Sequence, residues 1–104
     1  MILLVLTTVA TRADADALAR AMVEQRLAAC AQISAIDSVY RWQGALQAEP
    51  EFRLLFKTLP ERYAALQAAL RECHPYQLPA IVGWTCDAAL PDFVDWVAGQ
   101  TQAG

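Results

Sequence analysis

Hydrophobic and polar positions change their period several times along the chain, and each change marks a predicted element. Residues 1–8 form a continuous apolar run with β-branched members, which is typical of a strand buried on both faces. From Thr11 onward the apolar positions follow helical spacing, and Thr11 to Asp14 matches a capping box. A helix is therefore expected to begin at Thr11.

The middle of the chain alternates with the period of a strand. Residues 33–43 are predicted to form a long strand, Gly44 opens a turn, and residues 51–57 are predicted to form the return strand. The core face of the return strand consists of Phe52, Leu54 and Phe56. The two strands are expected to pair as a hairpin.

Helical spacing then returns. Residues 58–61 match a second capping box, with a proline in the first turn of the helix. The buried stripe of this helix has four predicted members: Tyr63, Leu66, Leu70 and Cys73. Residues 80–86 are predicted to form a fourth strand, and Pro91 starts a short terminal helix.

This order of elements predicts the fold. Two strand–helix–strand units joined through a hairpin give an α+β fold, the ferredoxin-like split βαβ sandwich (βαββαβ), followed here by a C-terminal helix. We expect one domain over residues 1–104, with an antiparallel sheet and two helices on one of its faces. Little chain remains to cover the other face, so an assembly such as a trimer is expected.

The composition argues against two classes of partner. Apolar residues make up 57% of the chain, a high share that also favours a buried oligomer interface. A net charge of −3 argues against nucleic-acid binding, which needs clustered lysine and arginine. No stretch reaches the apolar length of a membrane span, so no membrane insertion is expected. Residues 1–6 lack a basic leader and a cleavage site, which favours a strand over a signal peptide.

The cysteines Cys30, Cys73 and Cys86 are odd in number and widely spaced, without a CxxC pair. Reduced, mostly structural thiols in a cytoplasmic protein are therefore expected. Cys73 is predicted to lie in the core, and Cys86 is the thiol expected to be most exposed. For Cys30, packing as a small apolar residue and ligation of a soft metal both remain open.

The connector at residues 74–79 (HPYQLP) holds the one histidine of the chain, an aromatic hydroxyl and two prolines. A residue before proline avoids helical geometry, so His74 and Leu78 are both expected to be extended. The stiff connector indicates either a binding surface that presents His74 and Tyr76, or a proline-rich helix end with a solvated histidine.

The first candidate site is a metal site built on His74. The imidazole of His74 suits Cu(II) or Zn(II), and Glu51, Glu49 and Cys30 are candidate partners, some of them from a neighbouring subunit. The alternative is that these residues bind no metal, because a single histidine with distant acidic residues does not usually form a metal site.

A second candidate site binds a small anionic or aromatic ligand. Tyr40 and Trp42 share one face of the long strand, Lys57 ends the partner strand, and Tyr76 lies in the connector. Paired aromatic rings and a cation can clamp such a ligand. Alternatively, these aromatic side chains pack between subunits.

Four segments together resemble the CutA divalent-cation tolerance family: QRLAAC at 25–30, SVYRWQG at 38–44, FKT at 56–58 and HPYQLP at 74–79. The resemblance implies an intertwined homotrimer, similar in architecture to the PII signalling proteins, in which the hairpin of residues 40–55 extends across a neighbour. It also implies a role in tolerance of copper and other divalent metals, with no enzymatic activity established for the family. The chain departs from the family pattern at Gln43, Ala45, Ala80 and Thr7, where relatives often carry a charge or a thiol.

The favoured hypothesis is a non-enzymatic trimer of metal tolerance that binds a divalent cation or small ligand in clefts between subunits. The alternative is a PII-like signalling or scaffold trimer that docks a protein partner. Enzymes are disfavoured, because no serine–histidine–acid pattern is visible and residues 7–12 lack the glycine of a phosphate loop.

Overall fold

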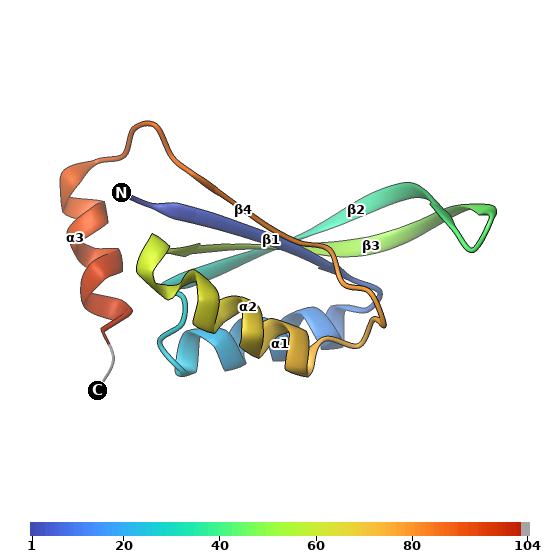
Figure 1. The fold of residues 1–104 in the computed structure, drawn as a ribbon, viewed down its shortest axis with the longest axis horizontal. Coiled ribbons are helices and arrows are strands. Elements are labelled where there is room, and N and C mark those ends of the chain that lie inside the picture. The colour runs from blue at the N-terminus through green and yellow to red at the C-terminus, as the bar shows by residue number, and fades with distance from the viewer. Residues whose placement is uncertain (103–104) are drawn as a thin grey trace.

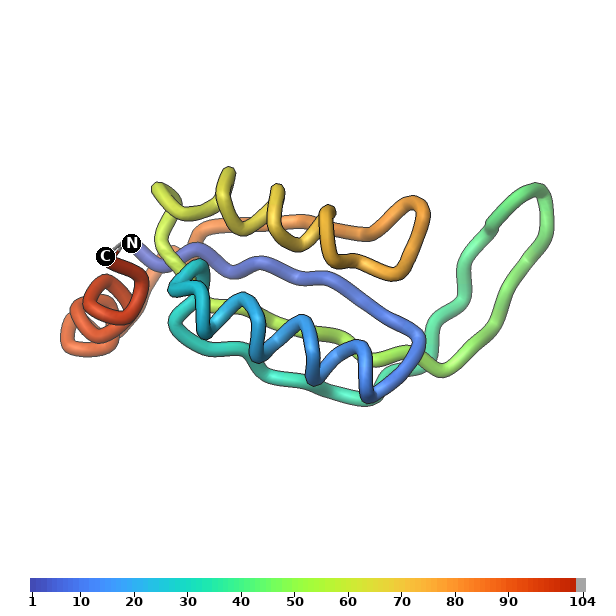
Figure 2. The backbone as a smooth tube through the Cα atoms, turned by 90° about the horizontal axis from the view of Figure 1, so that it is seen from below, coloured from blue at the N-terminus to red at the C-terminus, as the bar shows by residue number. Residues whose placement is uncertain are grey.

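The computed structural model describes residues 1–102 and has the predicted α+β, ferredoxin-like architecture. Its elements are β1 (Leu3–Val9), α1 (Arg12–Glu24), β2 (Cys30–Trp42), β3 (Ala45–Thr58), the 3-10 turn η1 (Pro60–Arg62), α2 (Tyr63–Cys73), β4 (Ile81–Thr85) and α3 (Pro91–Gln100). The sheet is antiparallel with strand order β2-β3-β1-β4. Helices α1 and α2 cover one face of it, as predicted (Figures 1 and 2).

The core forms where the apolar periods of strands and helices meet. Alternate residues of β1 are buried, beginning with Leu3 and ending with Val9. The core between the sheet and these two helices includes Val5, Leu18, Met22, Leu54, Phe56, Leu66 and Leu70. The predicted start of α1 is confirmed, since the Asp14 backbone N–H donates to Thr11 Oγ1 at 3.1 Å. Burial of this apolar face, rather than helix propensity alone, holds both helices on the sheet.

The prediction of a second capping box at residues 58–61 was wrong. The Thr58 hydroxyl is buried and donates to the Leu27 backbone carbonyl at 2.8 Å, so it ties the end of β3 to the turn before β2. The residue that caps η1 is Leu59, which makes no side-chain cap bond. The spacing of residues 58–61 matched a capping box, but the Thr58 hydroxyl bonds to a residue that is distant in the sequence.

The hairpin strands are longer than predicted. β2 begins at Cys30 rather than at residue 33, and β3 begins at Ala45 rather than at residue 51. Residues 45–50 pair with residues 37–42 beyond the end of β1, where no core imposes alternation. The turn is confirmed: Gln43 and Gly44 have φ values of 50° and 79°, as in a two-residue turn that matches strand twist.

The burial of two cysteines was also mispredicted. Cys73 is exposed, although its helical spacing placed it in the core stripe, because it lies in the last turn of α2. Cys86 and Cys30 are half-buried. Cys86 packs beside the small cluster in which Val97 of α3 meets Ile2 and Ala29.

Within residues 1–102, no helix covers the second face of the sheet. Helix α3 lies at one end of the sheet instead, near the start of β1 (Figure 1). The uncovered face carries Leu4, Leu6 and Leu55 at its centre, with Val82 (52% exposed) and Trp84 (45% exposed) on β4. Among the described residues, none of the helices is long and apolar enough to cross a membrane.

Two glycines provide a test of the packing, with opposite expected signs. Gly83 pairs with Val5 on β1, and a Cβ there would lie 3.0 Å from Tyr63 Cε1 and 3.4 Å from the Leu4 carbonyl oxygen. We expect Gly83→Ala to lower the free energy of unfolding by about 1–2 kcal/mol through overpacking. Gly99→Ala, in open space on α3, should raise it by about 0.5–1 kcal/mol through helix propensity. Urea unfolding of both variants is the measurement, and a loss at Gly99 or a gain at Gly83 would contradict the packing described.

Candidate functional site

His74 lies at the end of α2, and its backbone is extended (φ −69°, ψ 134°), as expected before proline. Its side chain is only 9% exposed. The Tyr76 backbone N–H donates to Nδ1 at 3.1 Å, so the proton of the neutral ring is assigned to Nε2. Nε2 in turn lies 2.9 Å from Thr7 Oγ1, which it can meet as a donor. Both ring nitrogens are therefore engaged within the chain.

Burial is the main cause that lowers the pKa of His74 below its usual value. A backbone hydrogen bond at Thr8 and the carboxylates of Asp14 and Glu51 act in the opposite direction and are weaker. The imidazole is thus neutral at pH 7. The interpretation of the connector as a helix end with a solvated histidine was wrong, because the ring is buried.

Tyr76 and Glu51 form the second contact of the site. The Tyr76 hydroxyl donates to Glu51 Oε2 at 2.6 Å, and the centre of its ring lies 5.1 Å from that of His74. Glu51 is only 8% exposed. Burial, followed by the hydrogen bond to Glu51, strongly raises the pKa of Tyr76. The hydroxyl therefore remains a protonated donor to a buried acid.

Tyr40 and Glu49 repeat this contact farther along the hairpin. The Tyr40 hydroxyl donates to Glu49 Oε1, and this hydrogen bond is the main cause that raises the pKa of Tyr40. Glu49 and Glu51 are two residues apart on β3 and share a strand face. We call Thr7, Tyr40, Glu49, Glu51, His74 and Tyr76 the hairpin-base cluster, since it lies where the hairpin leaves the sheet.

The remaining predicted residues are not part of this cluster within one chain. Cys30 pairs with Lys57 in the sheet register, and Lys57 is six positions from Glu51 along β3, a separation of about 20 Å. The Lys57 ammonium donates to Gln32 Oε1. Trp42 lies two residues beyond Tyr40 toward the hairpin tip and is exposed.

The metal set His74, Cys30 and Glu51 is therefore not assembled in a single subunit. Within residues 1–102, no three histidine, cysteine, aspartate or glutamate side chains gather as a metal centre would require. Using His74 as a ligand would also require its bond to Thr7 or to the Tyr76 amide to open. The donors of one chain do not fit a closed metal site.

Sequence reasoning missed two contacts of the cluster, the one between Thr7 and His74 and the one between Tyr40 and Glu49. Thr7 was noted as a position where some members of the resembled family carry a thiol, but not as the hydrogen-bond partner of His74. Its signal was available, because it is the one polar residue among the alternate positions 3, 5, 7 and 9 that form the buried face of β1. Tyr40 and Glu49 are nine residues apart, and only the register of the hairpin brings them together.

Comparison with known proteins shows one consistent relationship. The family described as CutA1 divalent ion tolerance protein matches residues 3–100. The divalent-cation tolerance protein CutA of Thermus thermophilus is 37% identical over 98 residues, which cover 93% of this chain and 95% of the relative.

Solved structures agree with this relationship. CutA from Synechococcus elongatus PCC7942 superposes with a TM-score of 0.94 at 44% identity, covering 97% of this chain and 90% of that one. The periplasmic divalent cation tolerance protein CutA from Archaeoglobus fulgidus superposes with a TM-score of 0.95 at 28% identity, covering 98% and 100%. The similarity thus includes the hairpin and the terminal helix as well as the sandwich.

Proposed function

The chain belongs to the CutA1 divalent ion tolerance family, and on that basis we propose that it is a non-enzymatic homotrimer of divalent-metal tolerance, copper included. The trimer binds a divalent cation or a small ligand in the clefts between its subunits. The observation that carries this proposal is the hairpin-base cluster, in which Glu49 and Glu51 meet tyrosine hydroxyls rather than cationic side chains. The free thiols of the chain support a cytoplasmic location.

Two apolar surfaces of the single chain support self-association. One is the uncovered sheet face around Leu6 and Leu55. The other is the outer hairpin, where Val39 and Leu46 are each 70% exposed and which bends away from the body of the subunit (Figure 2). Exposed apolar patches of this kind mark interaction sites. A closed ring of identical subunits covers both with a single repeated contact.

A head-to-tail ring also accounts for the scattered ligand residues. The hairpin with Tyr40 and Trp42 projects from one end of the subunit, while Cys30 and Lys57 lie toward the opposite end of the sheet. In a ring, the hairpin of one copy reaches the next copy, so residues that are far apart in one chain become neighbours across the contact. We therefore assign the ligand set Tyr40, Trp42, Lys57 and Tyr76 to the cleft between subunits.

A Cu(II) titration of the metal-free protein by calorimetry tests the cation part of this proposal. Glu51→Gln keeps an acceptor for the Tyr76 hydroxyl but removes the charge, so we expect binding to weaken by about tenfold or more, the loss of one charged ligand. His74→Ala should also weaken copper binding, because it removes the imidazole ligand of the proposed set. Glu72→Gln, an exposed change on α2, is the matched control and should bind as the parent does.

Two results would contradict direct binding at the cluster. One is heat that does not saturate in the parent protein. The other is an unchanged affinity in Glu51→Gln, which would place any bound copper elsewhere. Either result leaves the trimer to be tested on its own.

A further inference from the structure

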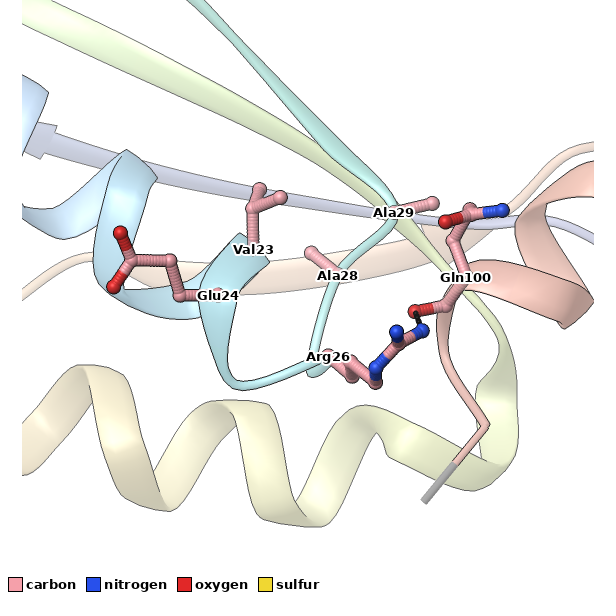
Figure 3. A pocket seen from close by; sticks show the side chains of 6 residues that line it. All are labelled: Val23, Glu24, Arg26, Ala28, Ala29 and Gln100. Carbon is pink, nitrogen blue, oxygen red and sulfur yellow. Dashed lines mark hydrogen bonds between the residues drawn. The ribbon is translucent and has the colours of Figure 1, made fainter. Parts of the chain in front are cut away.

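Helix α3 is held to the end of the subunit by one of its faces. Its inner face packs through Val97, which is buried against Ile2 and Ala29. At its C-terminal end, Arg26 Nη1 donates to the Gln100 carbonyl oxygen at 3.4 Å (Figure 3). The helix therefore has a fixed position, and its opposite face points away from the subunit.

This outer face of α3 combines an exposed aromatic ring with acidic side chains. Asp95 and Trp96 follow Asp92 by three and four positions, so the three share one face, and all are exposed. Trp96 is 45% exposed, and its ring stacks on that of Phe93 with the centroids 5.7 Å apart. No lysine or arginine follows Arg71 in the sequence, so no basic residue of the same helix balances these acids. The outer α3 face (Asp92, Asp95 and Trp96) thus offers apolar area and negative charge to a partner.

One face of the outer hairpin has the complementary character. Arg41 on β2 pairs with Leu46 on β3, and Val39 lies two positions before Arg41, so the three share a face. Val39 and Leu46 are each 70% exposed. Arg41 is also exposed, and it is the only charged residue among residues 38–48. The outer hairpin face (Val39, Arg41 and Leu46) is therefore apolar with a single positive charge.

The two faces do not meet within one chain. The hairpin and α3 lie at opposite ends of the subunit, whose longest dimension is 45 Å (Figures 1 and 2). A contact between them must therefore join two copies head to tail, which is the kind of contact that closes identical subunits into a ring. Charge complementarity at such a contact selects the partner and fixes its register.

We propose that, in the trimer, the outer hairpin face of one copy docks on the outer α3 face of the next copy. The apolar side chains of the hairpin lie against Trp96, and the Arg41 guanidinium lies between Asp92 and Asp95. A guanidinium can pair with carboxylates and stack on an indole ring, so Arg41 uses both features of the helix. Arginine and aromatic residues are also the types enriched at the core of protein interfaces. This inference rests on the proposed trimer and adds the surface on which each hairpin ends.

Photo-crosslinking tests the contact directly. p-Benzoylphenylalanine replaces Leu46, which is exposed in the single chain, so the variant should fold. The variant is isotope-labelled and refolded together with the unlabelled parent, so that mass spectrometry separates crosslinks between copies from crosslinks within one copy. We expect crosslinks between copies to residues 91–100. Crosslinks between copies on any other element would overturn the inference and leave the trimer standing.

Charge reversal tests the ion pairs through the rate at which trimers exchange subunits. Arg41→Glu places a third acid beside Asp92 and Asp95, so we expect exchange to be about tenfold faster or more. Adding Asp95→Arg restores a pair of opposite charges, so the combined variant should exchange more slowly than Arg41→Glu alone. The matched control is Arg20→Glu, which makes the same change of charge at an exposed position of α1 and should exchange as the parent does.

The remaining outcomes separate this inference from the trimer itself. Equal exchange rates in the parent and in Arg41→Glu would overturn the inference, as would a combined variant that exchanges faster than Arg41→Glu. A trimer without crosslinks between copies would also overturn it and would leave the outer α3 face to a basic protein partner. A parent with the mass of one chain in light scattering would refute the proposed trimer, and this contact with it.

Discussion

Replacement of His74 by alanine is expected to lower the free energy of unfolding by about 2–4 kcal/mol at neutral pH. The buried imidazole bridges the Thr7 hydroxyl of β1 and the Tyr76 backbone N–H of the connector. Without it, two polar groups lose their partners and a cavity opens beside the core. Urea unfolding is the measurement, and a change smaller than about 0.5 kcal/mol, the size typical of an exposed site, would contradict the burial described.

A double-mutant cycle with Thr7→Val separates the hydrogen bond from the cavity. Valine keeps the shape of threonine at this fully buried position but cannot pair with Nε2. We expect the two changes together to cost less than their sum, with a coupling of about 1 kcal/mol. Additive losses would mean that His74 stabilises the fold by volume alone.

The stabilisation by His74 also depends on pH, and its sign follows from the lowered pKa. Burial favours the neutral ring in the folded state, so its contribution is fully present above the unfolded pKa of about 6.5. It is lost progressively as the pH falls below that value toward the folded pKa. The difference in unfolding free energy between the parent and His74→Ala should therefore stay constant from about pH 8 to about pH 6.5 and shrink as the pH falls below that value. A difference that stays constant as the pH falls from about 6.5 to about 5 would contradict a neutral, buried imidazole.

Where a signal is local, the sequence was sufficient. The Thr11 cap needs only Asp14 three residues later, and the turn at Gly44 needs only its own backbone freedom. The apolar run of β1 and the helical spacing of α1 are also visible in neighbouring residues of the sequence. Together with the order of the elements, these signals led to the ferredoxin-like fold.

Where a partner is distant in the chain, the sequence was not sufficient. Thr58 matched a cap by spacing, but Leu27, 31 residues away, holds its hydroxyl. His74 was expected at the surface, but its ring is buried and bonds to Thr7, which is 67 residues away in the sequence. Residues 45–50 were not predicted as a strand. They pair only with β2, and no core beneath them imposes alternation of apolar and polar residues.

The same distinction limits the ligand sites. A single chain places Glu51 beside Tyr76 but leaves Cys30 and Lys57 far along the sheet. Residues that converge only through a neighbouring copy have no signal in the spacing of one sequence. The oligomeric state therefore decides whether the predicted ligand residues form a site.

Leu6→Glu is expected to dissociate the proposed trimer into single chains. Leu6 lies on the uncovered sheet face, paired with Leu55 on one side and Val82 on the other. In the single chain its side chain is half-exposed, so a glutamate there can still reach water and the fold should persist. In the trimer the carboxylate would be buried without a partner, at a cost of about 3–5 kcal/mol at each contact. Light scattering of the parent and the variant measures the change in mass.

Ala17→Glu is the matched control, since it adds the same charge at an exposed position of α1, on the covered side of the sheet. It should leave the mass at three chains, and circular dichroism should show that both variants are folded. A parent protein that is already a single chain would refute the trimer. A Leu6→Glu protein that keeps the trimer mass would place the subunit contact on the hairpin rather than on the open sheet face. Loss of the trimer together with loss of saturable ligand binding would locate the ligand residues between subunits, because the hairpin-base cluster of each chain remains intact in Leu6→Glu.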